Sequence, residues 1–205
     1  MPEEWGILEI WGIFEKLFKQ FFLFSNMKRG TKTLSQKTER KYLPEFVYGG
    51  MDGSITTFAV ISGVIGASLS SSVVLILGFA NLFADGFSMS ISNYISTKSR
   101  NETSNGPKMN EYKTSLATFF SFILIGFIPL ISFVLASVTN NPLLVEKQFE
   151  YSFILTGLAF VTVGWFKGII TKKHKVKSVL QTFIIGGVAS LLAFGVGRFI
   201  STLIN

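Results

Sequence analysis

The stretch Tyr48-Gly-Gly-Met-Asp-Gly-Ser-Ile-Thr-Thr-Phe58 decides the fold, because it sets a carboxylate, that of Asp52, inside an apolar segment. That segment runs from Phe46 to Ala67, and a second one, Val73 to Thr97, contains Asp85. Apolar segments of this length are typical of transmembrane helices. An ionisable residue inside one costs about 2.5 to 3.5 kcal/mol on insertion scales and is by default a candidate for function.

The composition of the chain indicates one polytopic membrane domain. Of its 205 residues, 48% are hydrophobic and only 15% are charged. The net charge of +7 does not require a nucleic-acid partner, because the basic residues lie in short segments between apolar ones, where membrane topology explains them. The chain has no cysteine, which excludes disulfide, thiolate-metal and cysteine-nucleophile chemistry. His174, in a lysine-rich loop, is interpreted as a solvated side chain.

We expect an all-α protein with five transmembrane helices. Each apolar stretch is long enough to cross a bilayer core at 1.5 Å per residue. Pro129, in the third stretch, is expected to bend its helix. The predicted spans are about 44–68, 73–98, 114–138, 149–171 and 176–203.

The loops between these spans predict the orientation of the chain. The 98–113 and 172–177 loops are rich in lysine, whereas 68–72 has no charge and 139–148 has one lysine. Because cytosolic loops carry the excess of Lys and Arg, we expect a multi-pass protein with its N-terminus in the cytosol and its C-terminus on the other side.

The segment before the first span has two parts. Residues 1–24 carry apolar side chains at a spacing of three and four, with polar residues opposite, which predicts an amphipathic helix. We expect it to lie flat in the membrane interface; the alternative is docking on the protein's own spans or on a partner. Residues 25–43 form a basic, cytosolic linker, and 44–205 form the five-span domain.

Polar side chains form a row along the second span. Asn81, Asp85, Met89 and Asn93 are four residues apart, a spacing that sets them on one helical face. Asp52 and Thr56 make a shorter row of the same kind in the first span.

The two rows are expected to lie at similar depths in the membrane. Asp52 lies eight residues from Pro44 and Met89 lies nine residues from Lys98, so both are about 12 to 14 Å deep from the same side. They can therefore face each other, with Asp85 about one turn deeper.

The residue types in these rows point to a metal ion. Oxygen ligands alone suit Ca²⁺ or Mg²⁺, whereas a thioether favours softer cations such as Fe²⁺, Mn²⁺, Co²⁺ or Zn²⁺. Two alternatives stay open: Met89 can serve packing alone, and Asp85 can hydrogen-bond a neighbouring backbone group or Thr56. Asn81 and Asn93 are better explained as hydrogen bonders between helices than as obligate ligands.

One chain offers too few donors for the six ligands that such ions often take. A two-fold axis beside the first span would double Asp52 and Met89, so we expect a homodimer. The glycines at 49, 50 and 53 would permit the close approach. Small residues at helical spacing, Gly49 and Gly53 as well as Gly63 and Gly197, are expected above all to serve helix packing.

These residues resemble the vacuolar iron transporter family, in particular its short prokaryotic branch. The specific motifs are Gly49-Gly-Met-Asp-Gly-Ser-Ile-Thr-Thr-Phe-Ala-Val60 and Asn81-Leu-Phe-Ala-Asp-Gly-Phe-Ser-Met89. Weaker likeness continues through Gly126-Phe-Ile-Pro-Leu130 and Gly164-Trp-Phe-Lys-Gly168, so that the resemblance covers about 44–203.

The resemblance implies a homodimer of five-span subunits that moves Fe²⁺, and often Mn²⁺, out of the cytosol in exchange for protons. The path would lie between the two first spans, with the family's aspartate at Asp52 and its pathway methionine at Met89. Asn81 stands where relatives have an acidic or polar residue, and Asn93 stands where many have glutamate. The metal site suggested by the two rows and the resemblance comprises Asp52, Met89, Asp85, Asn81 and Thr56.

The loop between the second and third spans departs from the family's pattern. Plant and protozoan members carry a metal-collecting helical extension there, rich in glutamate and methionine. Here the loop holds only Glu102, Met109 and Glu111 as such residues, so the extension is absent. The metal ion would then be captured at the mouth of the path in the membrane, where Glu45 is the nearest acid, or by another protein.

The leading functional hypothesis is a secondary transporter that exports Fe²⁺, and Mn²⁺ or other divalent transition metals, by proton antiport. An empty carboxylate in the membrane favours its proton, and a divalent cation displaces that proton. No phosphate-binding loop for a nucleotide occurs in the chain, and no resident cofactor is expected.

Two other classes of function are alternatives. A membrane interaction or scaffold module would recruit a partner through the amphipathic and basic N-terminus, with the aspartates only joining helices. An intramembrane enzyme has little support, because Asp52 and Asp85 differ in depth by about a turn and lack the flanking motifs of aspartyl proteases. We therefore expect no enzyme, and a prokaryotic plasma membrane rather than a vacuole.

Overall fold

The computed structural model describes residues 41–139 and 141–204, and this part of the chain is all-α, as expected. The interfacial helix expected at 1–24 lies outside the described residues, as does the basic linker up to residue 40. Both therefore stay predictions.

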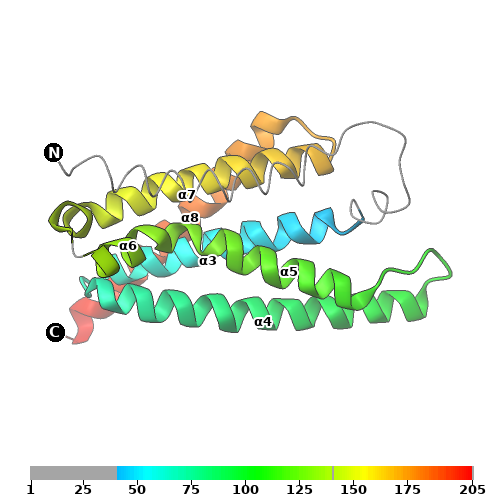
Figure 1. The fold of residues 1–205 in the computed structure, drawn as a ribbon, viewed down its shortest axis with the longest axis horizontal. Helices are drawn as coiled ribbons and strands as arrows, with labels where there is room; N and C mark the ends of the chain where they lie inside the picture. The colour runs from blue at the N-terminus through cyan, green and yellow to red at the C-terminus, as the bar shows by residue number, and fades with distance from the viewer. Residues whose placement is uncertain (1–40, 140, 205) are drawn as a thin grey trace.

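In the described part of the chain, five long helical segments run roughly along the long axis of the molecule (Figure 1). The third of them is broken into an α-helix, a short 3₁₀ turn and a second α-helix. Helix α3 lies between the α4–α5 pair and the α7–α8 pair (Figure 1). The elements are α3 (Leu43–Gly66), α4 (Ser71–Thr103), α5 (Glu111–Gly126), η1 (Ile128–Leu130), α6 (Ile131–Thr139), α7 (Pro142–Ile170) and α8 (Lys175–Ile204).

Four segments of the described chain are long and apolar enough to cross a membrane. They are Ser71–Thr103, Glu111–Thr139, Pro142–Ile170 and Lys175–Ile204. Helix α3 is long enough, but it carries Asp52 among glycine, serine and threonine residues, which lowers its hydropathy. Because α3 packs against α4, α5, α7 and α8, its Ser54, Thr57 and Ser62 side chains are buried in protein, whereas Asp52 is only half-buried. A fifth span at α3 therefore stays a prediction.

The break in the third segment lies at Pro129, where a bend was expected. A proline inside a helix lacks the N–H donor and crowds the preceding turn, so α5 ends at Gly126 and the chain passes through η1 before α6 begins. The hydroxyl of Ser152 on α7 donates to the Pro129 carbonyl at 2.7 Å, which satisfies a buried acceptor at the break.

Glycines let α3 approach two neighbours within the subunit. A Cβ on Gly53 would collide with the Phe122 carbonyl oxygen of α5, and one on Gly197 of α8 would collide with the Gly63 carbonyl oxygen of α3. The prediction that Gly63 and Gly197 serve helix packing is confirmed. A Cβ on Gly49 would likewise lie only 2.6 Å from the Thr118 carbonyl oxygen. Gly49 and Gly53 therefore serve the α3–α5 contact in one chain, which confirms the prediction that they serve helix packing. Their use in the approach of a second subunit stays a prediction.

The apolar core consists of two clusters on either side of α3. One joins α3 and α5 to α6 and α7, and includes Val47, Ile125 and Phe166. The other joins α3 and α5 to α4 and α6, and includes Ile61, Leu82 and Phe122. Helix α8 is the least buried of the four long apolar segments: only 11% of its 18-residue apolar stretch is buried inside the protein.

One end of the bundle, on the right in Figure 1, collects the start of α3, the α4–α5 loop and the α7–α8 turn. We call it the basic end, because the predicted lysine-rich loops, 98–113 and 172–177, lie there. The C-terminal end of α8 lies at the opposite end beside the α3–α4 turn, where the Ser201 hydroxyl donates to the Ala67 carbonyl at 3.1 Å.

Candidate functional site

The row predicted on the first span lies on a partly uncovered face of α3. Tyr48, Asp52 and Thr56 follow one another at four-residue spacing; Tyr48 is 59% exposed, and Asp52 and Thr56 are half-buried. Gly49 and Gly53 are buried against α5. Because that contact occupies another side of α3, the Asp52 row stays accessible within one subunit.

Thr56 links this row to α4. Its hydroxyl donates to the Asp52 backbone carbonyl at 2.9 Å. The Asn81 amide nitrogen in turn donates to the Thr56 hydroxyl oxygen at 3.5 Å. Asn81 is therefore a hydrogen bonder between helices, and through Thr56 it fixes α4 beside the turn that holds Asp52.

Asp85 lies on the outer face of α4. It is exposed in the subunit and stands between the exposed side chains of Phe83 and Phe87. The alternative role considered for Asp85, a hydrogen bond to the backbone or to Thr56, is not found among the described residues. Its carboxylate nevertheless acts electrostatically on that of Asp52, so the two acids belong to one region.

Met89 and Asn93 follow along the same helix toward the basic end. Met89 is half-buried and packs against the cluster that contains Leu82. The Asn93 amide nitrogen donates to the Thr118 hydroxyl of α5 at 2.5 Å, and Asn93 accepts a bond from Thr97 at 3.3 Å. Asn93 thus holds α4 on α5, which matches its predicted role.

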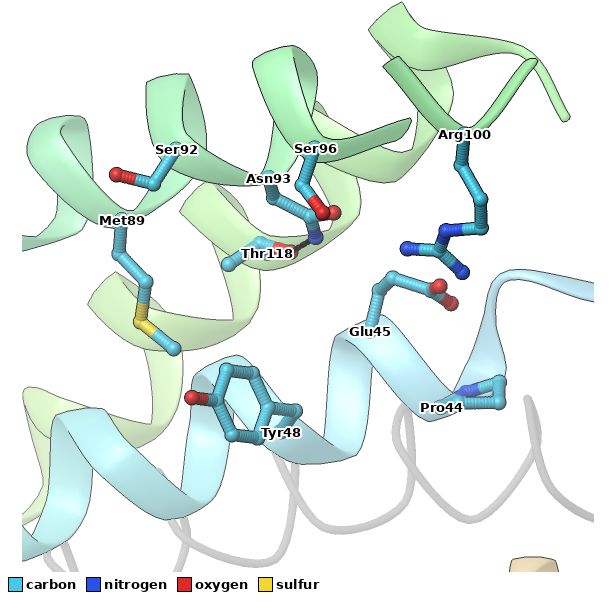
Figure 2. Close-up of a pocket in the computed structure, with 9 residues that line it drawn as sticks. All are labelled: Pro44, Glu45, Tyr48, Met89, Ser92, Asn93, Ser96, Arg100 and Thr118. Atoms are coloured by element: carbon cyan, nitrogen blue, oxygen red, sulfur yellow. Dashed lines mark hydrogen bonds between the residues drawn. The ribbon is translucent and has the colours of Figure 1, made fainter. Parts of the chain in front are cut away.

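A cavity of about 420 Å³ opens between α3, α4 and α5 at the basic end. In Figure 2 the Met89 side chain extends from α4 toward α3, where Tyr48 lies, and the Arg100 guanidinium faces the Glu45 carboxylate. One buried oxygen of Glu45 has no hydrogen-bond partner among the described residues. The lining residues are Pro44, Glu45, Tyr48, Met89, Ser92, Asn93, Ser96, Arg100 and Thr118.

The structure brings the five predicted site residues together only in part. Asn81 contacts Thr56, Asp85 acts on Asp52, and Met89 lines the cavity with Tyr48, one helical turn from Asp52. Within the described part of the chain, no three Asp, Glu, His or Cys side chains come together as a metal-binding group. The described residues of one subunit therefore do not assemble a set of charged ligands around an ion.

Sequence analysis missed most of the cavity lining, although a signal for it was present. Ser92, Ser96 and Arg100 are four residues apart on α4, so they form a second polar row beside that of Met89. Glu45 was noted as the acid at the membrane mouth, but its position opposite Arg100 comes from the way α3 packs against α4.

The α4–α5 connection is short and held in place by hydrogen bonds. Asn101 bonds both the backbone N–H and the carbonyl of Met109, and its amide donates to the Glu111 carboxylate at 2.8 Å. The polar groups of this loop are thus used to close the turn between two helices.

Comparisons with known proteins identify the family. The sequence profile of the VIT family matches residues 43–111 and 104–198. The vacuolar iron transporter of Plasmodium berghei is 24% identical over 80% of this chain and 84% of its own length. Vacuolar iron transporter 1 of Eucalyptus grandis is 25% identical over 80% of this chain and 89% of its own length.

A shorter match of higher identity concerns the vacuolar iron transporter of Toxoplasma gondii, which is 35% identical over 43% of this chain and 30% of its own length. The profile match covers more than half of the chain and includes the Asp52 and Met89 motifs. The chain is a multi-pass integral membrane protein that belongs to the VIT family, the vacuolar iron transporters, and it is not an enzyme.

Proposed function

We propose that the protein exports Fe²⁺, and also Mn²⁺ or other divalent transition metals, from the cytosol by proton antiport. Asp52 and Met89 line the path at the interface of a homodimer, and Asp85 assists. The observation that carries the proposal is the outer face of α3 and α4, which presents Asp52, Asp85 and Met89 without a covering helix from residues 41–139 or 141–204.

Asp85 is exposed in the subunit, so we expect this face to meet either a second protein surface or water rather than lipid. A carboxylate turned toward lipid costs about 2.5 to 3.5 kcal/mol, and such residues almost always face a protein interface or a water-filled cavity. A second subunit seated on the α3–α4 face would supply that cover. It would also bring a second Asp52 and a second Met89 to the path.

The donor set supports the dimer on chemical grounds. One subunit offers the Asp52 carboxylate and the Met89 sulfur, whereas the Asn81 amide and the Thr56 hydroxyl already bond each other. Two subunits double the free donors to two carboxylates and two thioethers. This mixed oxygen and sulfur set suits Fe²⁺ and related first-row cations better than Ca²⁺ or Mg²⁺.

The cavity at the basic end suits the mouth of the path. It runs from Glu45, near the start of α3, to Met89 deeper in the helix pair. The unpaired oxygen of Glu45 is an acceptor that a cation from the cytosol could use. We propose that the basic end is cytosolic, following the positive-inside rule; the C-terminus is then on the other side, and the plasma membrane stays our prediction for the location.

Uptake into proteoliposomes tests the proposal. The purified full-length protein would be reconstituted, and Fe²⁺, Mn²⁺, Co²⁺ and Zn²⁺ flux measured with a pH gradient imposed in either direction. We expect metal flux that reverses its preferred direction with the gradient. Absence of flux for all four ions would instead favour a membrane interaction module.

A further inference from the structure

A second cavity, of about 500 Å³, lies at the α7–α8 turn, away from the Asp52 path. Its walls come from the turn and from the first two turns of α8, and they contain no carboxylate. The lining residues are Lys172, Lys173, His174, Lys177, Ser178 and Gln181.

The lysines are not required to cap α7. The last carbonyls of that helix already accept backbone N–H groups: the Lys167 carbonyl from Thr171 at 2.9 Å and the Gly168 carbonyl from Lys173 at 3.1 Å. Lys172 adopts a φ of 54°, the left-handed conformation common after a helix C-terminus. The backbone thus closes the turn and leaves the lysine side chains available for another partner.

The same lysines are unfavourable for α8. A helix N-terminus carries partial positive charge and is normally complemented by acidic residues. α8 has no acid in its first turn, which instead holds Lys175 and Lys177. The positive charges therefore repel one another and the helix dipole, and an anion bound among them would relieve that repulsion.

The start of α8 packs closely against the end of α7 beside the cavity. Ser178 belongs to the lining and is only 3% exposed. Its hydroxyl oxygen lies 3.3 Å from the position that a Cβ on Gly168 of α7 would take, and the Cα of Lys175 lies 2.7 Å from that position.

The surroundings of the cavity are those of a membrane surface. Val176 is 71% exposed and Leu180 is 59% exposed, so apolar side chains flank the basic cavity. Trp165 of α7 is 44% exposed, and the Lys175 ammonium lies 4.7 Å from the centroid of its ring. Tryptophan at the end of an apolar helix is typical of the interface between headgroups and acyl chains.

We propose that this cavity binds the phosphate of an anionic phospholipid. The lysines attract the phosphate, and the acyl chains lie along Val176 and Leu180. Basic pockets between transmembrane helices are known sites for such headgroups. The site does not include any residue of the proposed metal path and is independent of it.

Trp165 supplies a local reporter. The chain has three tryptophans, so Trp5→Phe with Trp11→Phe leaves Trp165 alone beside the cavity. The full-length protein would be reconstituted in phosphatidylcholine containing brominated phosphatidylglycerol or, separately, brominated phosphatidylcholine. Quenching of Trp165 then gives the relative association constant of each lipid. We expect clear preference for phosphatidylglycerol.

Two triple variants separate this cavity from a diffuse basic surface. Each lysine near an anionic membrane contributes about fivefold to association, so Lys172→Gln, Lys173→Gln and Lys177→Gln together should lower the preference by at least about tenfold. The matched control, Lys98→Gln with Lys108→Gln and Lys113→Gln in the other basic loop, should leave it unchanged.

Three results would overturn the proposal. Equal quenching by the two lipids would mean that no anionic headgroup is selected. An equal effect of the control triple variant would mean that total charge, rather than this cavity, attracts the lipid. Displacement of brominated phosphatidylglycerol by excess inorganic phosphate would mean that the site takes a soluble anion instead of a lipid.

Discussion

The Asn81 amide nitrogen lies 3.5 Å from the Thr56 hydroxyl oxygen, and the same hydroxyl donates to the Asp52 carbonyl at 2.9 Å. This chain of two bonds connects α4 to the backbone of Asp52. Asn81 and Thr56 both belong to the predicted metal site, yet within the subunit they bond each other. Their clearest role is to hold the two helices in register at the depth of the Asp52 carboxylate.

Removing that link should weaken the fold modestly. Hydrogen bonds between membrane helices contribute on average about 0.6 kcal/mol, and up to about 1.7 kcal/mol, in double-mutant cycles. We expect a coupling free energy in this range between Asn81→Ala and Thr56→Val. The measurement is the free energy of unfolding in detergent for both single variants and the double variant. Strictly additive effects would contradict a direct bond.

The close contact of α3 with α5 at Gly53 predicts whether a substitution raises or lowers the stability of the protein. Gly53→Ala brings a methyl group onto the Phe122 carbonyl oxygen, and overpacking of this kind costs about 1 to 3 kcal/mol. The control is Gly187→Ala on α8, where a Cβ would meet no atom within 4 Å and the helix should gain about 0.5 to 1 kcal/mol. Thermal unfolding in detergent should thus shift downward for the first variant and upward for the second.

Much of the fold could be predicted from sequence because membrane helices follow directly from apolar length. The five helical segments and the break at Pro129 required only hydropathy and the missing proline donor. The spacing of four residues also indicated which polar side chains share a face. These are local properties of the chain, which do not depend on how the helices pack.

The parts that sequence reasoning missed depend on rotation of one helix against another. Gly49 and Gly53 have the same spacing whether they face α5 or a second subunit, and only packing decides between the two. The Arg100 guanidinium likewise faces the Glu45 carboxylate although the two residues are 55 positions apart in the chain. For the same reason, the outward position of Asp85 could not be read from its place in the Asn81 row.

Met89 is predicted to matter through its sulfur. Met89→Leu keeps the volume and apolarity of the side chain but removes the soft donor, so Fe²⁺ and Co²⁺ flux should fall more than Mn²⁺ flux. Met51→Leu on α3 is a matched control, because Met51 packs against the apolar cluster of α5 and α7. An equal loss for all three ions in Met89→Leu would mean that Met89 acts by shape alone.

Asp52 is predicted to be essential for flux and dispensable for folding. A charge in the membrane disfavours the empty protein, and it is useful only when a cation is bound. Asp52→Ala should therefore abolish metal transport by reconstituted protein while its elution volume and thermal unfolding in detergent stay near those of the wild type. Glu150→Gln, which removes an exposed acid on α7, should transport normally. Wild-type flux through Asp52→Ala would exclude the proposed path.

The last prediction concerns the coupling of metal to protons. If Asp52 alternates between a protonated, empty form and an ionised, metal-bound form, each turnover exchanges protons for metal. Outward metal flux must then be driven by a higher proton activity on the non-cytosolic side, since protons from that side empty the site. The direction of the pH gradient that drives metal export thus follows from the direction of exchange alone.

Asp85 is our candidate for the residue that receives the proton, because its exposed carboxylate acts on that of Asp52 and lies nearer the middle of the span. Asp85→Asn keeps the shape and polarity but cannot exchange a proton. It should preserve Mn²⁺ binding measured by calorimetry in detergent, while slowing exchange and flattening its dependence on the pH gradient. Glu150→Gln again serves as the control. If flux through the wild type is indifferent to the gradient, the protein is a channel or uniporter, and the role of Asp85 as a relay falls with the antiport.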